Sequence, residues 1–261
     1  IPYPASFHAH GKQIIAGIGW ELCCRTWRET GDAAVEPASA PQWMKNAGII
    51  HQTVNPAVYA AVSDEALLEA GVDILLHAMP ATVERKDDLW SLTVCTKTGL
   101  RTVQGRILVD CTGDANVVSL AGFEVERNPE IQASTLVVQV GGYDAGALDY
   151  PAIQVAFEQE VSAGRMKRTD PGWGQGHIDF FLRSYGGNRI HVVGVDARTS
   201  EGKTEAEIEG RKAMMRLLRF CRKQPGLKDF KVLSCAMECG IRETVTIKGK
   251  RRITVQDFEG G

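Results

Sequence analysis

The chain has 261 residues, of which 44% are hydrophobic and 24% are charged, and its formal net charge is -2. This length suffices for one large core or two smaller ones, and the charge argues against bulk affinity for nucleic acid. The sequence has no run of about 18 apolar residues and no signal-peptide pattern at its start. We therefore expect a cytoplasmic protein that binds neither a membrane nor nucleic acid, and the oligomeric state stays open.

The seven cysteines are odd in number and lie mostly inside apolar patterns, which is typical of reduced, buried thiols. Cys235 and Cys239 stand four residues apart, and His8 and His10 stand two apart. The cysteine pair lacks C-x-x-C spacing and has no histidine nearby, and the histidine pair has no third ligand in the sequence. We therefore predict no metal site and keep a metal or redox role as the less favoured alternative.

The amino-terminal part predicts a helix followed by a meander of strands. Asn55 followed by Pro56 is typical of a capped helix start, and Gly71 predicts the end of that helix. Apolar runs then predict three strands, with a hairpin turn at 97–99 between the last two. The predicted strands cover about 72–77, 89–96 and 100–110.

A second unit, with a sheet and flanking helices, is predicted after Gly122. The alternation over 134–140 predicts a strand, and 151–163 predicts a helix that Gly164 ends. A hairpin is also predicted in this unit. Its strands cover 180–185 and 189–195, joined across 186–188.

Thr204 and Glu207 form a capping-box pattern, which predicts a helix that continues to about residue 223. Six basic residues on this helix suggest either an RNA-binding face or a solvated one. We favour the solvated face, because acidic residues balance the whole chain and no aromatic residues alternate with the charges. The basic residues are Arg211, Lys212, Arg216, Arg219, Arg222 and Lys223.

The segment 169–177 has the glycine-rich composition of a mobile loop. As a lid, it would stack Trp173 over a substrate and supply His177 as a proton-transfer group. As a surface connection it would do neither, and both interpretations stay open.

The stretch 106–126 is the most informative part of the chain. Its apolar run 107–109 predicts a strand buried on both faces, and Thr112, Gly113 and Asp114 break that strand. A short helix is predicted to follow and to end at Gly122, with the N-H groups of its first turn facing a ligand. This arrangement predicts a ligand-binding edge for an anion or a polar cofactor.

Four segments, in this order along the chain, carry a resemblance to a known family. They are His10–Gly17 (HGKQIIAG), Glu69–His77 (EAGVDILLH), Val109–Asn116 (VDCTGDAN) and Gly240–Thr244 (GIRET). The chain resembles the FAD-dependent oxidoreductases of the glutathione-reductase-like superfamily, in particular the flavoproteins of succinate dehydrogenase and fumarate reductase. It departs from the family pattern at Ala115 and Asn116, where Gly and Asp are usual.

Two other parts of the family pattern are not found in the sequence: the opening G-x-G-x-x-G turn and the closing glycine-rich segment. The nearest match to the first is Gly17-Ile18-Gly19, but residue 22 is Leu. We interpret it as a loop that enters a helix near Trp20. The chain therefore resembles the central part of a longer flavoprotein, and alone it is expected to bind FAD poorly or not at all.

The resemblance implies roles for particular residues. Arg242 would stabilise the reduced flavin or a substrate carboxylate, and His177 is the candidate proton-transfer group. Glu243 is expected to form a two-point ion pair with Arg242, which would orient the arginine or pin the connection between domains. The catalytic candidates are thus Arg242, Glu243 and His177, and the cofactor-binding candidates are Gly11, Lys12, Gln13, Thr112, Gly113, Asp114 and Arg242.

The implied fold class is α/β (α+β). We expect a partial Rossmann-like FAD-binding domain with a β-meander at 1–122, an α+β substrate or cap domain at 123–236, and a return into the FAD-binding domain at 237–261. The implied activity is FAD-dependent hydride transfer with an unidentified small-molecule substrate. The alternatives are a cofactor-free fragment without activity of its own and an RNA-modifying flavoprotein relative.

Overall fold

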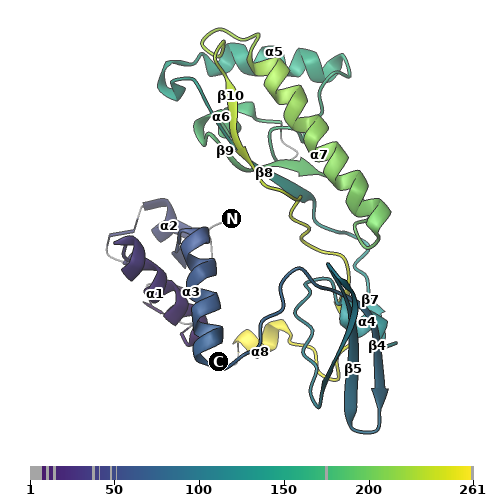
Figure 1. Ribbon diagram of the computed structural model, residues 1–261. Helices are drawn as coiled ribbons and strands as arrows, with labels where there is room; N and C mark the ends of the chain where they lie inside the picture. The colour runs from purple at the N-terminus through teal and green to yellow at the C-terminus, as the bar shows by residue number, and fades with distance from the viewer. Residues whose placement is uncertain are drawn as a thin grey trace. The chain divides into compact units, whose positions relative to one another are not determined.

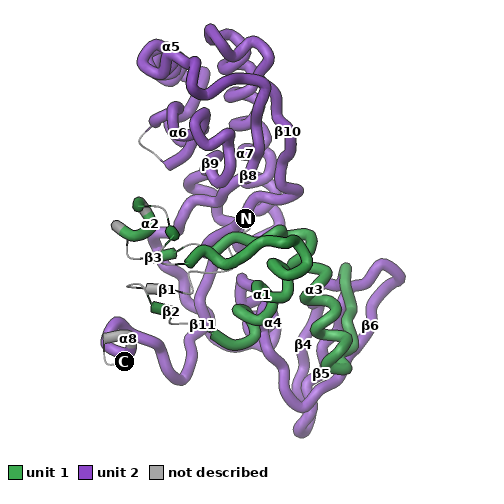
Figure 2. Tube along the Cα trace, turned by 90° about the vertical axis from the view of Figure 1, so that its left-hand side faces the viewer, with its two compact units in different colours: residues 1–77 green, residues 78–261 purple. Residues whose placement is uncertain are grey.

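The computed structural model describes residues 8–9, 12–13, 16–36, 39–40, 42–47, 49–50, 52–173 and 176–259. The chain divides into two compact units, residues 1–77 and residues 78–261, coloured green and purple in Figure 2. Helices mix with sheets in which every pairing between the described strands is antiparallel. The predicted α+β character is therefore confirmed, whereas no parallel, Rossmann-like sheet is present among the described residues.

Unit 1 is built on two helices that pack against each other, α1 (Ile18–Thr30) and α3 (Pro56–Glu69) (Figure 1). The start of α3 is as predicted, because the Asn55 side chain accepts hydrogen bonds from the N-H groups of Ala57 and Val58. The smaller elements are α2 (Gln42–Ala47), β1 (His8–Ala9), β2 (Lys12–Gln13) and β3 (Ile49–Ile50), with the strands in the order β2-β1-β3.

A small aromatic core holds α1 in place. Trp27 and Cys23 are buried together with Val54, and Trp20 meets Trp27 edge to face at a centroid distance of 5.4 Å. The indole N-H of Trp27 donates to the carbonyl of Thr53 at 2.8 Å. The side chains of Trp20, Cys23 and Trp27 thus link α1 to the residues that precede α3.

Unit 2 begins with a three-stranded meander, β4 (Met79–Lys86), β5 (Leu89–Thr96) and β6 (Gly99–Gly105), in that spatial order. The sequence predicted β5 and most of β6. The predicted strand at 72–77 is wrong, because no described strand pairs with those residues and Leu76 is exposed. The alternating residues 79–86, which pair with β5 across a tight turn at Asp87, form the first strand instead.

Residues 134–235 form a second sheet covered by helices, which we term the large-core region. Strands β8 (Ser134–Gly141), β9 (Gly186–Val192) and β10 (Lys231–Cys235) lie in the order β10-β8-β9. The strand β8 was predicted, and its inward residues Leu136 and Val138 are fully buried. The helices of this region are α5 (Tyr150–Ser162), α6 (Ile178–Arg183) and α7 (Ser200–Cys221), preceded by a short 3-10 turn at Ala145–Ala147.

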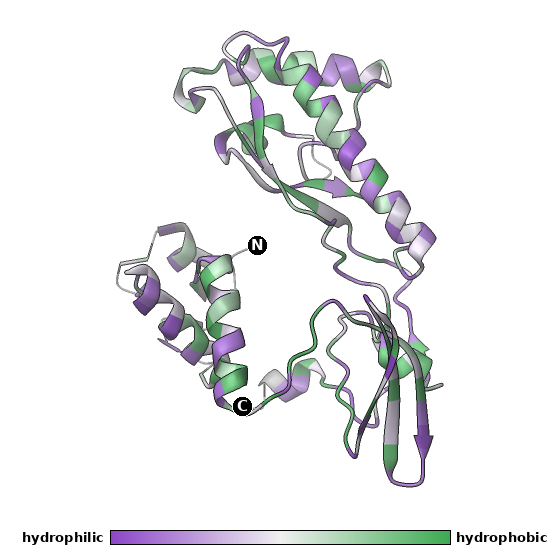
Figure 3. Ribbon diagram, viewed as in Figure 1, coloured by the Kyte–Doolittle hydropathy of each residue, from purple (hydrophilic) through white to green (hydrophobic). Residues whose placement is uncertain are grey.

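The helix α7 lies against β8 and β9, and hydrophobic and hydrophilic residues alternate along it (Figure 3). It begins four residues before the predicted capping box. Thr199 is the capping residue, and its hydroxyl accepts from the N-H of Gly202 at 3.1 Å. Thr204 lies inside the helix and donates to the carbonyl of Ser200 at 2.7 Å, so its side chain does not cap the helix.

The predicted strand at 180–185 is wrong, because residues 178–183 form the helix α6. Ile178, Phe181 and Leu182 are its buried residues, and their spacing of three and four places them on one helical face. An apolar run this short does not distinguish a strand from a helix turn. The strand that was predicted at 189–195 is β9, and it pairs with β8.

The remaining elements of unit 2 are short and lie outside the large-core region. Within the described residues, no helix combines the length and the apolar composition needed to cross a bilayer. The short elements are α4 (Asn116–Leu120), β7 (Val125–Glu126), β11 (Thr246–Ile247) and α8 (Val255–Glu259), and β7 pairs with β11.

Candidate functional site

The approach to the Thr112-Gly113-Asp114 turn differs from the predicted buried strand. Residues 106–111 form no ladder with any described strand, and Ile107 and Val109 are 82% and 73% exposed. The apolar pattern predicts a doubly buried strand, but no neighbouring strand in the described part of the chain covers it. The run therefore presents an apolar surface that leads into a polar turn.

A carboxylate at the start of the turn organises what we term the TGD turn, residues 110–116. Asp110 accepts hydrogen bonds from the N-H of Thr112 at 2.9 Å, from the hydroxyl of Thr112 at 2.7 Å and from the N-H of Val118 at 3.0 Å. Burial raises the pKa of Asp110, but hydrogen bonds from Thr112, Val118 and Val117 outweigh this effect and hold the pKa below its ordinary value. Asp110 is thus an ionised anchor for the turn.

The first turn of α4 is saturated within the protein. The N-H of Asn116 donates to the Thr112 hydroxyl at 3.0 Å, and the N-H groups of Val117 and Val118 donate to the Asp110 carboxylate. The expectation that these N-H groups face a ligand is therefore wrong. Gly113 is exposed and adopts φ 82° with open space around its Cα, whereas Ala115 adopts a left-handed φ of 51° without being glycine.

The segment 240–244 connects the TGD turn to the large-core region. The hydroxyl of Thr244, which is buried, donates to Asp114 at 2.9 Å across 130 residues of sequence. At the other end, Gly240 and Thr135 exchange two backbone hydrogen bonds, at 2.8 and 3.0 Å. The third and fourth sequence motifs are therefore neighbours in space, and Arg242 lies midway between their contacts.

Arg242 and Glu243 point to different partners. One guanidinium nitrogen of Arg242 donates to Asn188 at 3.0 Å and to the Thr135 hydroxyl at 3.3 Å. Glu243 accepts from the amide of Asn128 at 3.3 Å. The predicted two-point ion pair between Arg242 and Glu243 is not formed in the described structure, since adjacent residues in an extended segment project to opposite sides.

A pocket of about 270 Å³ lies beside Arg242. Residues from the predicted loop and from α6 and β9 line it, and the guanidinium of Arg242 lies 5.3 Å from the ring centroid of Trp173. His177 is exposed on the wall of this pocket, whereas Arg242 does not line the pocket and reaches its edge only through the contact with Trp173. The lining residues are Pro171, Gly172, Trp173, His177, Phe180 and Arg189.

His191 is a site residue that the sequence analysis missed. It is 3% exposed, its ring lies 4.2 Å from that of Trp173, and neither ring nitrogen forms a well-aligned hydrogen bond within the described residues, although the backbone of Gly172 lies close enough to interact with the ring. Burial lowers the pKa of His191 below its ordinary value; the backbone of Gly172 has a smaller, opposite effect, and the nearby Arg242 and Arg189 add to the lowering. Alternation along β9 could have indicated this, because Arg189 and His191 share one face of the strand.

Buried charges fix the base of the loop. Asp170 is 1% exposed and receives two hydrogen bonds from Arg216 of α7, at 2.7 and 2.8 Å. Arg216 also contacts Glu209 at 2.7 Å, and its pKa is raised, chiefly by the hydrogen bond to Asp170. Arg216 was predicted to lie on a solvated face, and the structure places it in an internal ion-pair network instead.

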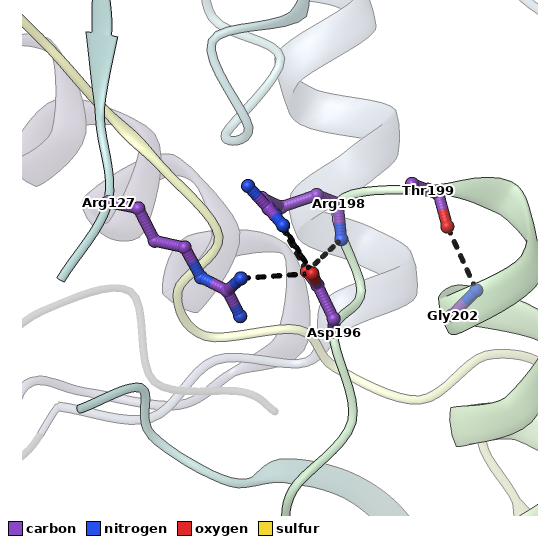
Figure 4. A network of polar contacts seen from close by, with 5 residues as sticks. All are labelled: Arg127, Asp196, Arg198, Thr199 and Gly202. Atoms are coloured by element: carbon purple, nitrogen blue, oxygen red, sulfur yellow. Dashed lines mark hydrogen bonds and ion pairs between the residues drawn. The ribbon is translucent and has the colours of Figure 1, made fainter. Parts of the chain in front are cut away.

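A second network holds the start of α7 (Figure 4). Asp196 receives hydrogen bonds from the side chain of Arg198 and an ion pair from Arg127 at 3.0 Å. These contacts, with the hydrogen bond to Arg198 first, lower the pKa of Asp196. The network links Arg127, which follows β7, to the loop before α7. The next residue, Asn128, donates to Glu243.

The other predicted site residues are less informative. Lys12 and Gln13 form β2 in unit 1, and their position against the TGD turn stays a prediction. Gly11 lies outside the described residues, as do Gly174 and Gln175 of the loop.

The cysteines lie in different environments. All seven cysteines are free, but Cys95, Cys111 and Cys235 are exposed, so the expected burial holds for only part of them. Burial raises the pKa of Cys239 to about 11. No cluster of three His, Cys, Asp or Glu side chains that could hold a metal ion occurs in the described part of the chain.

Comparison with known proteins gives one result that bears on this site. The model of the FAD dependent oxidoreductase family matches residues 1–261, and the chain therefore belongs to that family. No curated protein and no solved structure matched the chain. The family membership and the proximity of the two motif segments agree on an oxidoreductase of the flavin-dependent kind.

Proposed function

We propose that this chain supplies one wall of an FAD site and the adjoining substrate pocket of an enzyme that transfers hydride between the flavin and a small organic molecule. The observation that carries the proposal is the hydrogen bond between Thr244 and Asp114, which brings the TGD turn together with the Arg242 segment. This contact places two segments that carry family motifs side by side, as a shared ligand site requires.

The residues at the TGD turn fit a flavin nucleotide on one side. Gly113 leaves open space at the backbone, and the exposed Ile107 and Val109 offer an apolar surface beside it. An apolar surface next to a polar turn suits a ligand with a flat ring and polar attachments. The cofactor role of Gly11, Lys12 and Gln13 and the division into 1–122, 123–236 and 237–261 are part of the same proposal.

When bound, FAD would supply the hydride acceptor or donor of the reaction. The protein residues would orient and charge-stabilise the substrate. Arg242, fixed by Asn188 and Thr135, would place a permanent positive charge beside the pocket, and His177 would give or take the paired proton. Glu243 would act on position only, through Asn128.

The test is a titration of FAD into the full chain, followed by quenching of flavin fluorescence. Gly113→Leu should weaken saturable binding at least tenfold, because a side chain there would occupy the open face of the turn. Gly164→Leu is the matched control, since Gly164 has the same kind of left-handed backbone and open surroundings but ends α5. Wild-type protein without saturable quenching, or equal affinity in the two variants, would favour the cofactor-free alternative.

The RNA-modifying alternative gains no support from the helix α7. Arg216 is engaged with Asp170 and Glu209, and Arg211 is paired with Glu207 at 3.0 Å. Two of the six basic side chains are thereby neutralised within the protein. We therefore retain the flavin-dependent oxidation or reduction of a small molecule as the proposed function.

A further inference from the structure

The helix α7 carries two adjoining hollows on its surface, which we term the α7 track. The larger has a volume of about 480 Å³ and the smaller a volume of about 350 Å³. They share Arg211 and together follow the helix from Ser200 to Arg219, a length of about 29 Å at about 1.5 Å per residue. The helix packs on β8 and β9 through its buried residues, and the residues of the larger hollow alternate with these at helical spacing.

Apolar side chains are exposed along the track. Ile208 is 47% exposed, and Met237, from the segment after β10, is 91% exposed. Met215 stands seven residues after Ile208, so the two share one side of the helix in the larger hollow. Methionine side chains are unbranched and adapt their shape to an apolar neighbour. Exposed apolar side chains rimmed by polar ones are typical of a surface that contacts another protein.

Basic side chains flank these apolar ones. Lys212 stands four residues after Ile208, and Arg219 stands four residues after Met215. Both are exposed, and neither forms an ion pair in the described part of the chain. The whole chain has a formal net charge of -2, so this side of α7 departs in sign from the rest of the molecule. The charge complement of the track is therefore an acidic surface.

The carboxylates of the track distinguish between two kinds of acidic partner. Glu238 pairs with Lys203 at 2.8 Å and Glu207 pairs with Arg211 at 3.0 Å, and both glutamates line the smaller hollow. They would repel the closely spaced phosphates of a nucleic acid. None of the described residues that line the two hollows is aromatic, so bases would have no stacking platform. The apolar side chains between the charges instead suit a protein partner.

We propose that the α7 track is a docking surface for an acidic amphipathic helix of a partner protein. Apolar side chains on one face of that helix would cover Ile208, Met215 and Met237. Its carboxylates, at a spacing of three and four residues, would pair with Lys212 and Arg219. The track has room for a helix of about 20 residues. The inference goes beyond the proposed function, because no residue of the track belongs to the TGD turn or to the segment 240–244.

Binding is tested by fluorescence anisotropy with the full chain in the absence of flavin. The probe is a labelled synthetic peptide of about 20 residues with leucine on one helical face and glutamate beside it. The comparison probes are the same peptide with serine in place of leucine, the same peptide with lysine in place of glutamate, and an oligouridylate RNA. The leucine-glutamate peptide should bind saturably and at least tenfold more tightly than each of the three.

Three results would overturn the proposal. Equal binding of the serine peptide would mean a general cationic surface without an apolar contact. Equal or tighter binding of the RNA would mean a nucleic-acid face. No saturable binding of the leucine-glutamate peptide would remove the docking surface.

The charged contact is tested with Lys212→Glu and a matched control, Lys228→Glu. Both lysines are exposed, but Lys228 does not line the track. Lys212→Glu should weaken binding of the leucine-glutamate peptide at least tenfold, because it places a carboxylate opposite the carboxylates of the peptide, and Lys228→Glu should leave the affinity unchanged. Unchanged affinity in Lys212→Glu, or an equal loss in the control, would contradict the proposal.

The apolar contact is tested in the same way with Ile208→Ser. Its control is Val155→Ser, since Val155 is also apolar and is 59% exposed on a different helix, α5. Ile208→Ser should weaken the peptide at least fivefold and Val155→Ser should have no effect, with circular dichroism to confirm that all four variants fold. Full affinity in Ile208→Ser would mean that charge alone attracts the peptide and would reject an amphipathic partner.

Discussion

The large-core region and the TGD turn treat similar apolar sequence in opposite ways. In the large-core region, Leu136 of β8 and Ile190 of β9 are partners across the sheet and are fully buried. Before the TGD turn, Ile107 and Val109 belong to an equally apolar run and are mostly exposed. The comparison teaches that an apolar pattern specifies burial only where neighbouring elements are present, and that the turn keeps its shape through polar contacts.

The largest expected effect tests the burial side of this contrast. Phe157→Ala should lower the free energy of unfolding by about 3–5 kcal/mol, because Phe157 is fully buried and its removal leaves a cavity. Ile107→Ala should change it by less than about 0.5 kcal/mol. Urea unfolding monitored by circular dichroism measures both, and similar losses in the two variants would contradict the contrast.

A second variant tests whether the large-core region also depends on polar contacts. Arg216→Met should lower the free energy of unfolding by about 3 kcal/mol, because it leaves the buried Asp170 without its guanidinium partner. The control Arg211→Met breaks a more exposed pair with Glu207 and should change stability by less than about 1 kcal/mol. A loss in Arg216→Met no larger than in the control would show that the loop base does not need this pair.

Asp110→Asn tests the polar side of the contrast. It should destabilise the turn by about 1–2 kcal/mol at neutral pH, as expected for loss of a capping carboxylate. The pKa of Asp110 is lowered in the folded protein, so its contribution is complete above the ordinary pKa of an aspartate and is lost as the pH falls through the lowered value.

The measurement for this variant is amide hydrogen exchange at Val118, whose N-H donates to Asp110. Wild-type protection should decrease on acidification through that range, and the Asn variant should show low protection throughout. Asp88→Asn, in the exposed β4-β5 hairpin, is the control and should leave exchange at Val118 unaltered. Retained protection in Asp110→Asn would mean that other contacts shape the turn.

The smallest effect is a gain. Ala115→Gly should stabilise the protein by about 1 kcal/mol, since Ala115 has a left-handed φ of 51° that glycine adopts without strain. Ala121→Gly, at the right-handed position that ends the same helix α4, should destabilise by about 0.5–1 kcal/mol. Thermal unfolding of both variants checks the sign, and a loss in Ala115→Gly would show that the Cβ makes a contact worth more than the strain.

Much of the fold was predictable because it depends on local chemistry. The start of α3 follows from the Asn55 side chain and Pro56, and β8 follows from alternation. The sequence does not predict the helix α6, because a run of six residues with three buried apolar side chains suits a strand as well as a helix turn. The exposure of 106–111 was missed because burial depends on partners elsewhere in the chain.

The candidate site was predictable only in part. The motifs located the TGD turn and Arg242, but no local pattern shows that Thr244 bonds to Asp114. His191 and Arg189 stand on one face of β9, and that face acquires meaning only when Trp173 from the preceding loop covers it. Contacts between distant segments, rather than residue types, decide which polar residues share a site.

The bond between Thr244 and Asp114 also bears on how the chain matures. During synthesis the TGD turn leaves the ribosome long before residue 244 exists, so it must wait for most of unit 2 to be made before its aspartate is satisfied. Domains fold as they emerge, and closing a loop of this length adds little entropy beyond that of a much shorter one. The turn would then reach its final form only after the intervening sheet and helices have assembled, which couples the shape of the turn to synthesis of the Thr244 segment.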